Sequence, residues 1–266
     1  MPVAQPITLS TPQAMRYSRQ IMLAGFDLDK QEILLNSRVL QIGVGGLGCA
    51  AAQYLVAAGV GKLTLVDDDQ VELTNLQRQV LHREASVGEY KSHSAKASLQ
   101  QLNSQCELVS VTERLDDQAL AAAIAQHDLV LDCSDNLATR EQINALCYQA
   151  GTALVSGAAI RMEGQVSCFT FKPEHACYQC LSSSFGEQNL SCMEAGVMSP
   201  VVGIIGATQA LEAIKLLTDF GQSLVNKLLI FDATNSEWRS FHLVKNPQCK
   251  VCGVTENLNG ESTPQG

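Results

Sequence analysis

The stretch that decides the fold runs Arg38-Val-Leu-Gln-Ile-Gly43-Val-Gly45-Gly46-Leu-Gly48. Its first five residues form an apolar strand pattern, and the glycines that follow open a helix pattern. Glycines at these spacings let the chain turn tightly and bring backbone N–H groups close to a phosphate, at a helix N-terminus whose dipole favours anions. The stretch therefore predicts a nucleotide-binding loop. The alternative interpretation is a tight strand-to-helix turn that binds no ligand.

Outward from this loop, apolar strand patterns alternate with longer helix patterns. The strand patterns are Arg38–Ile42, Lys62–Asp67, Glu107–Arg114, Leu129–Cys133 and Thr152–Ala159. The helix patterns are Gly46–Ala58, Lys91–Leu102, Asp117–Gln126 and Asn136–Ala150. Short apolar strands separated by helices of this length are typical of βαβ units. We therefore predict an α/β fold, with a Rossmann-like, mostly parallel sheet and helices on both of its faces.

The pattern changes after Ala159, where strand patterns lie closer together. They are Gln165–Phe171, Lys227–Thr234 and Glu237–Val244, with one buried helix pattern at Ser199–Leu217. This spacing predicts an antiparallel extension of the sheet. Residues 172–198 show no clear periodicity, which is typical of a long functional loop. We expect a helical arm at 1–30, one domain at 31–253 with halves at about 31–160 and 161–253, and a disordered tail at 254–266.

The composition is that of a globular protein in water. The 266 residues carry a net charge of −9, with 46% hydrophobic and 17% charged residues. An acidic chain lacks the basic face that a phosphate backbone attracts, so nucleic acid is not an expected partner. The most apolar stretch, Val197–Leu211, is too short and too interrupted to span a bilayer, and no secretory signal opens the chain. We expect a cytoplasmic protein with no membrane partner.

An acidic triplet, Asp67-Asp68-Asp69, closes the second predicted strand. It begins nineteen residues after Gly48, where an acid would hydrogen-bond a ribose in a nucleotide-binding fold. Asp67 and Asp69 are therefore candidate nucleotide-binding residues. An acidic triplet by itself is more often a solvated loop.

Cationic and amide side chains follow the triplet. Asn75-Leu-Gln-Arg78-Gln comes next, and Lys91 opens the following helix pattern. These groups suit a triphosphate better than a single pyrophosphate. A nicotinamide dinucleotide is the alternative ligand. We disfavour it because none of the five histidines can be assigned as a catalytic residue for hydride transfer. Surface charge is the alternative role of Arg78 and Lys91.

The segment Asp132-Cys-Ser-Asp135-Asn136 closes the fourth predicted strand. In an open α/β sheet, ligands bind outside the carboxyl ends of the strands, which places Asp135 and Asn136 near the nucleotide. Mg²⁺ binds through one or two carboxylates plus phosphate oxygens, so Asp135 is our candidate magnesium ligand. The alternative role of Asp135 is to cap the helix that follows.

Ten cysteines point to metal or thiol chemistry in a reducing compartment. Four of them form two CxxC pairs, Cys177/Cys180 and Cys249/Cys252, with 68 residues between the pairs. Two such pairs have the ligand set of a closed, tetrahedral, structural zinc site. Cys192 lies between them as a possible thiol acceptor, although a small buried hydrophobe is the usual role of an unpaired cysteine.

Several linked motifs in this chain resemble those of the bacterial adenylating enzymes that activate ubiquitin-like sulfur carriers, relatives of the ubiquitin-activating enzymes. The resemblance spans Met15 to Gly253. Its motifs are Arg16-Tyr-Ser-Arg19-Gln, Gly43-Val-Gly-Gly-Leu-Gly48, Asn75-Leu-Gln-Arg78-Gln, Asp132-Cys-Ser-Asp-Asn136 and the two CxxC pairs. It implies an ATP- and Mg²⁺-dependent reaction, in which the C-terminal glycine carboxylate of a Gly-Gly-ended carrier attacks the α-phosphate. The products would be an acyl-adenylate and pyrophosphate.

The resemblance also implies roles for individual residues. The loop glycines Gly43, Gly45, Gly46 and Gly48 would line the nucleotide together with Asp69 and Asn136, and Asp67 would meet the ribose. Asn75, Arg78 and Lys91 would contact phosphates, Asp135 would take the magnesium, and the zinc ligands would be Cys177, Cys180, Cys249 and Cys252. Arg19 in such enzymes reaches into the partner subunit's site, which implies a homodimer. Residues 31–253 would then form the adenylating domain, and 161–253 its carrier-binding and zinc half.

Two segments, Ser156–Gly164 and Glu194–Met198, look most like the branch of this family that serves molybdenum cofactor biosynthesis. The carrier of that branch is the small subunit of molybdopterin synthase. The same activation of the thiamine-pathway carrier is the alternative. No rhodanese-like domain follows in the chain, so a separate sulfur donor is expected. A dehydrogenase and a non-catalytic, zinc-stapled scaffold are the distant alternatives.

Overall fold

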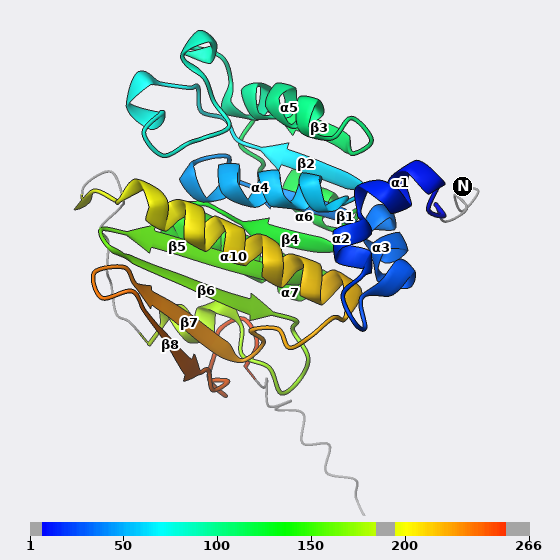
Figure 1. The fold of residues 1–266 in the computed structure, drawn as a ribbon. Helices are drawn as coiled ribbons and strands as arrows, with labels where there is room; N and C mark the ends of the chain where they lie inside the picture. The colour runs from blue at the N-terminus through cyan, green and yellow to red at the C-terminus, as the bar shows by residue number, and fades with distance from the viewer. Residues whose placement is uncertain (1–6, 185–194, 254–266) are drawn as a thin grey trace, which may run out of the picture.

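Arg38–Ile42 forms a central strand of an eight-stranded sheet. The computed structural model describes residues 7–184 and 195–253, and its strand order is β3-β2-β1-β4-β5-β6-β7-β8 (Figure 1). The strands are β1 (Arg38–Ile42), β2 (Lys62–Val66), β3 (Glu107–Val111), β4 (Leu129–Asp132), β5 (Ala153–Ile160), β6 (Glu163–Phe169), β7 (Lys227–Asp232) and β8 (Glu237–His242). Strands β1 to β5 pair in parallel, and β6 to β8 extend the sheet in antiparallel pairs. The predicted sheet and its extension are confirmed.

Helices cover both faces of the sheet. They are α1 (Thr11–Arg16), α2 (Ser18–Ile21), α3 (Asp27–Asn36), α4 (Gly46–Ala58), α5 (Lys91–Leu102), α6 (Asp117–Ile124), α7 (Leu137–Ala150), α8 (Tyr178–Ser182) and α10 (Ser199–Thr218), with short 3₁₀ turns η1 (Leu73–Asn75) and η2 (Glu84–Ser86). Helices α4 and α10 pack side by side on one face, and α6 and α7 lie on the other (Figure 1). The two layers match the prediction of helices on both faces.

The apolar run of β1 explains why both faces are covered. Val39 packs into the core beneath α4 and α10, whereas the next residue, Leu40, packs into the core beneath α6 and α7. Successive side chains of a strand point to opposite faces, so a continuously apolar strand must be buried on both. The side chain of Gln41 points to the α4 side, where it is buried and contacts the glycine loop.

Two features of the helices could not be anticipated from the sequence patterns. The predicted boundary between residues 30 and 31 falls inside α3, so the N-terminal arm and the domain share this helix. The long loop at 172–198 contains α8, whose five residues are too few to show a helical period. Cys192 and the tail at 254–266 lie outside the described residues, so the predictions made for them stay predictions.

Helix α10 is longer than the apolar stretch considered from the sequence. Its 20 residues, with a mean hydropathy of 1.4 over 18 of them, satisfy the length and composition of a membrane span, and half of that window is buried inside the fold. Val201, Ile205 and Ala213 are fully buried in the core that α10 shares with α4, and Glu212 is buried as well. These contacts identify α10 as a core helix that packs with α4 against one face of the sheet.

Candidate active site and metal centre

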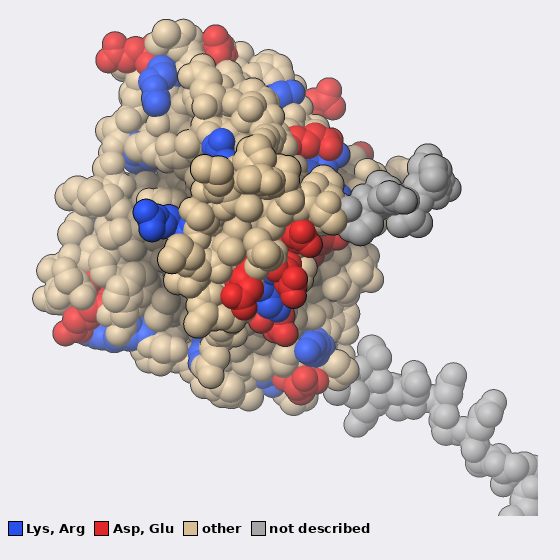
Figure 2. Space-filling model, turned by 45° about the vertical axis from the view of Figure 1, so that its right-hand side comes forward, with Lys and Arg blue, Asp and Glu red and all other residues tan. Residues whose placement is uncertain are grey.

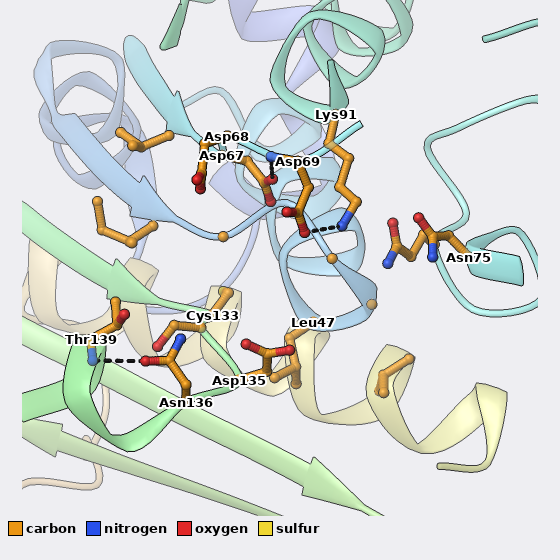
Figure 3. A pocket seen from close by; sticks show the side chains of 18 of the residues that line it. Leu47, Asp67, Asp68, Asp69, Asn75, Lys91, Cys133, Asp135, Asn136 and Thr139 are labelled. Carbon is orange, nitrogen blue, oxygen red and sulfur yellow. Dashed lines mark hydrogen bonds and ion pairs between the residues drawn. The ribbon is translucent and has the colours of Figure 1, made fainter. Parts of the chain in front are cut away.

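The carboxyl ends of β1, β2 and β4 open onto a cavity of about 720 Å³. The predicted residues that line it are Gly43, Gly45, Gly46, Asp67, Asp69, Asn75, Arg78, Lys91, Asp135 and Asn136. Figure 3 shows Lys91, Asn75 and Asp135 around one space, each reaching it from a different segment of the chain. Of the predicted site residues that the structure describes, Gly48 and Arg19 lie outside this cavity and the four cysteines form a separate cluster.

The glycine loop is closed by contacts that leave no room for side chains. Gly43 has a φ of +93°, and a Cβ there would lie 2.7 Å from the carbonyl oxygen of Cys133. A Cβ at Gly48 would lie 2.1 Å from the carbonyl oxygen of Gly43, so Gly48 makes the turn possible, and it is not among the residues that line the cavity. The buried Gln41 donates from Nε2 to the carbonyl oxygens of Gly43 (2.9 Å) and Gly48 (3.1 Å), which fixes the turn from below.

Asp67 connects the second strand to the loop. Its Oδ2 accepts a hydrogen bond from Val44 N at 2.7 Å, and its Oδ1 accepts one from Asp69 N at 3.0 Å. Burial raises the pKa of the Asp67 carboxyl, while the Val44 N–H and the Lys91 cation act to lower that pKa. The carboxylate is therefore held rigidly at the cavity wall, in the position predicted for a ribose contact.

Lys91 is a buried cation that faces the cavity. Its side chain is 9% exposed, and its Nζ lies 2.7 Å from Oδ2 of Asp69, a carboxylate that is 70% exposed (Figure 3). The alternative role of Lys91 as surface charge is wrong, because a solvated surface lysine would not be buried at the first turn of α5. Arg78 is half-buried, and its Nη1 lies 3.3 Å from the carbonyl oxygen of Thr74. The two cations line the same cavity.

The turn after β4 is anchored beneath the cavity by a buried carboxylate. Asp132 accepts hydrogen bonds from Ser134 N (3.0 Å), Ser134 Oγ (2.6 Å) and Ser156 Oγ (2.7 Å). Arg140 is also buried, and its Nη2 donates to the carbonyl oxygen of Ser134 at 2.5 Å. These bonds fix the backbone that immediately precedes Asp135.

Asp135 does not cap the next helix. The N-cap of α7 is Asn136, whose Oδ1 accepts a hydrogen bond from Thr139 N at 2.9 Å (Figure 3). Asp135 keeps an exposed carboxylate on the cavity wall. This carboxylate has the chemistry of a magnesium ligand, whereas Asn136 is engaged with the helix as well as lining the cavity.

Two buried glutamines were missed from the sequence, one that lines the cavity and one that supports the turn after β4. Gln79 is 3% exposed and lines the cavity, and its Oε1 has no hydrogen-bond partner among the described residues. A buried amide with a free end facing a cavity fits a polar ligand there. Gln209 of α10 donates from Nε2 to the carbonyl oxygen of Asp132 at 2.7 Å. Its signal in the sequence is a lone amide within an apolar helix.

Arg19 lies at the opposite end of α4 from the glycine loop. It is exposed on α2, and its neighbour Gln20 donates from Nε2 to the carbonyl oxygen of Ala58, the last residue of α4, at 3.1 Å. A helix of 13 residues is about 20 Å long, so Arg19 is far from the cavity of its own chain.

The four predicted zinc ligands form one cluster. Sγ distances are 3.6 Å for Cys177 to Cys249, 3.4 Å for Cys180 to Cys252 and 4.0 Å for Cys177 to Cys180. A zinc ion with four Zn–S bonds of about 2.3 Å needs sulfur atoms about 3.8 Å apart, whereas a disulfide needs about 2.05 Å. The sulfur donor set and its spacing therefore fit a tetrahedral zinc ion.

Backbone and amide groups also point at these sulfur atoms. Asn144 of α7 donates from Nδ2 to Cys177 Sγ at 3.7 Å, and Asn246 N donates to Cys180 Sγ at 3.4 Å. Hydrogen bonds of this kind stabilise negatively charged thiolates, the form that binds metal.

Comparison with known protein families matches residues 17–251 to the ThiF family. The chain belongs to the ThiF family. It is 54% identical to the molybdopterin-synthase adenylyltransferase of Escherichia coli K12 over 245 residues, which cover 92% of this chain and 98% of the relative. It is 47% identical to the sulfur carrier protein ThiS adenylyltransferase of the same organism over 239 residues, covering 90% and 95%. The predicted family and the predicted adenylyltransferase activity are confirmed.

Solved structures show the same fold in this ThiF-family chain. Escherichia coli MccB with MccA-N7isoASN aligns with a TM-score of 0.81 at 23% identity, covering 92% of this chain and 76% of that one. MccB with ATP aligns with a TM-score of 0.78 at 25% identity, covering 90% and 74%. The fold assignment thus rests on whole-chain similarity as well as on the strand order.

Proposed function

We propose that this protein uses ATP to adenylate the C-terminal glycine carboxylate of a small ubiquitin-like sulfur carrier, the small subunit of molybdopterin synthase. The observation that carries the proposal is the cavity that gathers a glycine loop, Lys91, Arg78 and Asp135 from separate segments. The similarity to molybdopterin-synthase adenylyltransferase, at 54% identity, supports this choice of carrier. The chemistry belongs to molybdenum cofactor biosynthesis.

The cations of the cavity would offset the electrostatic repulsion between the two reactants. A triphosphate carries about four negative charges, and the attacking carboxylate carries another, so the two reactants repel each other in water. Lys91 and Arg78 would neutralise the phosphates, and Asn75 would donate a hydrogen bond. The loop N–H groups at the start of α4 would hold phosphate oxygens, with Asp67 at the ribose. Bringing the carboxylate in line with the α-phosphate then lowers the entropic part of the barrier.

Asp135 fits a magnesium ion, because its exposed carboxylate faces the space where phosphate oxygens would lie. A bound magnesium ion supplies positive charge that stabilises the charge developing on the phosphates. The chain's own part is to hold Asp135 in place through the anchored Ser134 and the capping Asn136.

The cysteine cluster fits a structural zinc ion that joins the long loop to the end of the described chain. Four sulfur ligands leave no open coordination position for catalysis. The zinc would hold α8 next to the antiparallel strands, in the half of the chain expected to bind the carrier.

Arg19 supports a homodimer in which each cavity borrows this arginine from the partner subunit. Arg19 is exposed and far from the cavity of its own chain. Large apolar side chains are also exposed on α4 and α10 and directly after α2, among them Tyr54, Ile204, Leu211 and Met22. The face that carries the N-terminal helices shows wide uncharged areas between small, mixed charge clusters (Figure 2). Apolar, uncharged surface of this kind is typical of subunit interfaces.

One alternative substrate follows from a specific observation. The 47% identity to a ThiS adenylyltransferase keeps the thiamine-pathway carrier as the second candidate substrate. A separate protein would donate the sulfur, and we place the reaction in the cytoplasm.

ATP–pyrophosphate exchange with each purified carrier tests the proposal. We expect Mg²⁺-dependent exchange with the molybdopterin synthase small subunit, and at least about tenfold less with the thiamine-pathway carrier. Preference for the thiamine carrier would transfer the assignment to that pathway. Carrier-independent exchange, or none with either carrier, would contradict the proposed function.

A further inference from the structure

Three separate segments line the cavity with the groups proposed to bind phosphate, and they meet behind it at one buried residue, His82. The segments are the glycine loop, the stretch from Asn75 to Gln79, and helix α5. We propose that His82 is a positioning residue, which holds these three segments in register so that their N–H and cationic groups converge on the nucleotide. This inference rests on the proposed function and deepens it.

The hydrogen bonds of His82 join the loop to α5. Its Nε2 lies 3.2 Å from the carbonyl oxygen of Val44, and its Nδ1 lies 3.0 Å from Oγ of Ser94. A carbonyl oxygen only accepts, so the bond to Val44 places the proton of the neutral ring on Nε2. Ser94 Oγ, the partner of Nδ1, also lies 3.0 Å from Oγ of Ser86. His82 is 4% exposed, and burial lowers the pKa of its imidazole, which keeps the ring neutral. Cys49 Sγ donates to the same Val44 carbonyl oxygen at 3.4 Å.

Each end of this link leads directly to a predicted site residue. Val44 lies between Gly43 and Gly45, and its N–H donates to Asp67, so the imidazole and the carboxylate hold opposite sides of one loop residue. Ser94 lies three residues after Lys91, on the same side of α5.

The third segment, which carries Asn75 and Arg78, is joined to His82 through the backbone. The N–H group of His82 donates to the carbonyl oxygen of Gln79, at the end of that segment, at 3.1 Å. Rotation of the Val44 peptide would turn the following N–H group away from a phosphate. The imidazole therefore acts on nucleotide affinity without touching the nucleotide.

His127 provides a matched control. Its ring makes the same kinds of bond, 2.8 Å from Nε2 to Thr64 Oγ1 and 2.7 Å from Nδ1 to the carbonyl oxygen of Ala123, and burial lowers its pKa as well. It lies just before β4, at the opposite end of the strand from the cavity. A general effect of losing a hydrogen-bonded histidine would appear in both His82 and His127 variants.

The test compares His82→Leu, His82→Gln, Ser94→Ala and His127→Gln. Glutamine keeps a donor that can reach the Val44 carbonyl oxygen, whereas leucine fills the space without one. Calorimetry with Mg²⁺ and a non-hydrolysable ATP analogue gives the dissociation constant, and pyrophosphate exchange gives KM for ATP and for the carrier. We expect His82→Leu to weaken analogue binding and raise KM for ATP about fivefold to tenfold, as for loss of one or two buried hydrogen bonds, with KM for the carrier unchanged.

His82→Gln should recover most of that affinity, His127→Gln should bind the analogue like the wild type, and Ser94→Ala should bind it about threefold more weakly. Wild-type affinity in His82→Leu, or equal weakening in His127→Gln, would overturn the inference. If His82→Leu does not fold, wild-type affinity in Ser94→Ala overturns it instead. Failure of the wild-type protein to bind the analogue would contradict the proposed function and not the role of His82 alone.

Discussion

The cavity and the cysteine cluster are built in opposite ways, although α7 contacts both. At the cavity, charged groups from several segments face an open space, and Asp135 and Asp69 remain exposed. At the cluster, four sulfur atoms lie within 4.8 Å of one another and three of the four cysteines are buried. An open array of charges suits a ligand that must enter and leave, whereas a closed sulfur array suits an ion that stays. The two regions should therefore respond to mutation in opposite ways, one in activity and the other in stability.

The largest effect should come from the cavity. Asp135→Ala should lower carrier-dependent pyrophosphate exchange by roughly 100-fold or more, because the metal and its charge stabilisation are lost. The thermal midpoint should stay close to that of the wild type, since this carboxylate is exposed. Glu237→Gln, which changes an exposed carboxylate on β8, is the matched control and should keep full activity. Wild-type exchange in Asp135→Ala would refute the metal role.

Complementation tests whether the cavity is completed by a second subunit. Arg19→Ala and Asp135→Ala should each be inactive alone, and a heterodimer of the two should regain up to half of the normal activity, because one of its sites has both residues intact. The chains must be co-expressed or re-formed from dissociated subunits, and exchange is measured on the purified heterodimer. An inactive heterodimer would favour a purely structural role for Arg19.

At the cysteine cluster the expected effect is on stability. Cys177→Ser should lose bound zinc and at least about 3 kcal/mol of unfolding free energy, or roughly 6–12 °C in the thermal midpoint, because a closed thiolate site contributes folding free energy. Elemental analysis and calorimetry measure both quantities. Cys106→Ser, at a buried cysteine outside the cluster, should keep its zinc. A wild-type protein without stoichiometric metal would show the zinc assignment to be wrong.

The smallest expected effect is on the pH dependence of stability. It compares His82, next to the cavity, with His127, at the opposite end of β4. Burial lowers the pKa of both His82 and His127, so as pH falls the unfolded chain binds these protons before the folded protein does. Stability is therefore fully present above about pH 6.5 and is lost below it, by at most about 1.4 kcal/mol per pH unit for the buried His82 and by less for the half-buried His127, whose charge solvent screens. Urea unfolding near pH 7.5 and 5.5 should show a smaller loss in His82→Gln and in His127→Gln. An unchanged loss in both would contradict the assignment.

The sequence predicted what short, local patterns determine. The glycine loop, the alternation of strands and helices, and the CxxC pairs each lie within a few residues, and each has one dominant physical reading. The choice between metal ligand and helix cap for Asp135 needed the three-dimensional structure, because an aspartate suits either role and only the structure shows Asn136 at the cap. The role of Lys91 likewise depends on the three-dimensional structure, since its neighbours in the chain do not show that this cation is buried.

Other features depend on contacts between distant segments. His82 meets Val44 across 38 residues, and Gln209 meets Asp132 across 77, so no spacing rule indicates either pair. The distance of Arg19 from its own cavity depends on how α2 packs at the end of α4. Lone polar residues in apolar segments, such as Gln41 and Gln209, were the available signal, because a buried amide must find a partner.

The central claim is that the cavity joins an adenylyl group to the carrier's C-terminal carboxylate. The most direct measurement is the intact mass of the molybdopterin synthase small subunit after incubation with this protein, Mg²⁺ and ATP, with pyrophosphatase present to draw the reaction forward. The account predicts a carrier heavier by one adenylyl group, an unmodified carrier with Asp135→Ala, and no change in a carrier lacking its terminal Gly-Gly. Adenylylation of that truncated carrier, or an unmodified full-length carrier alongside continued ATP turnover, would contradict it.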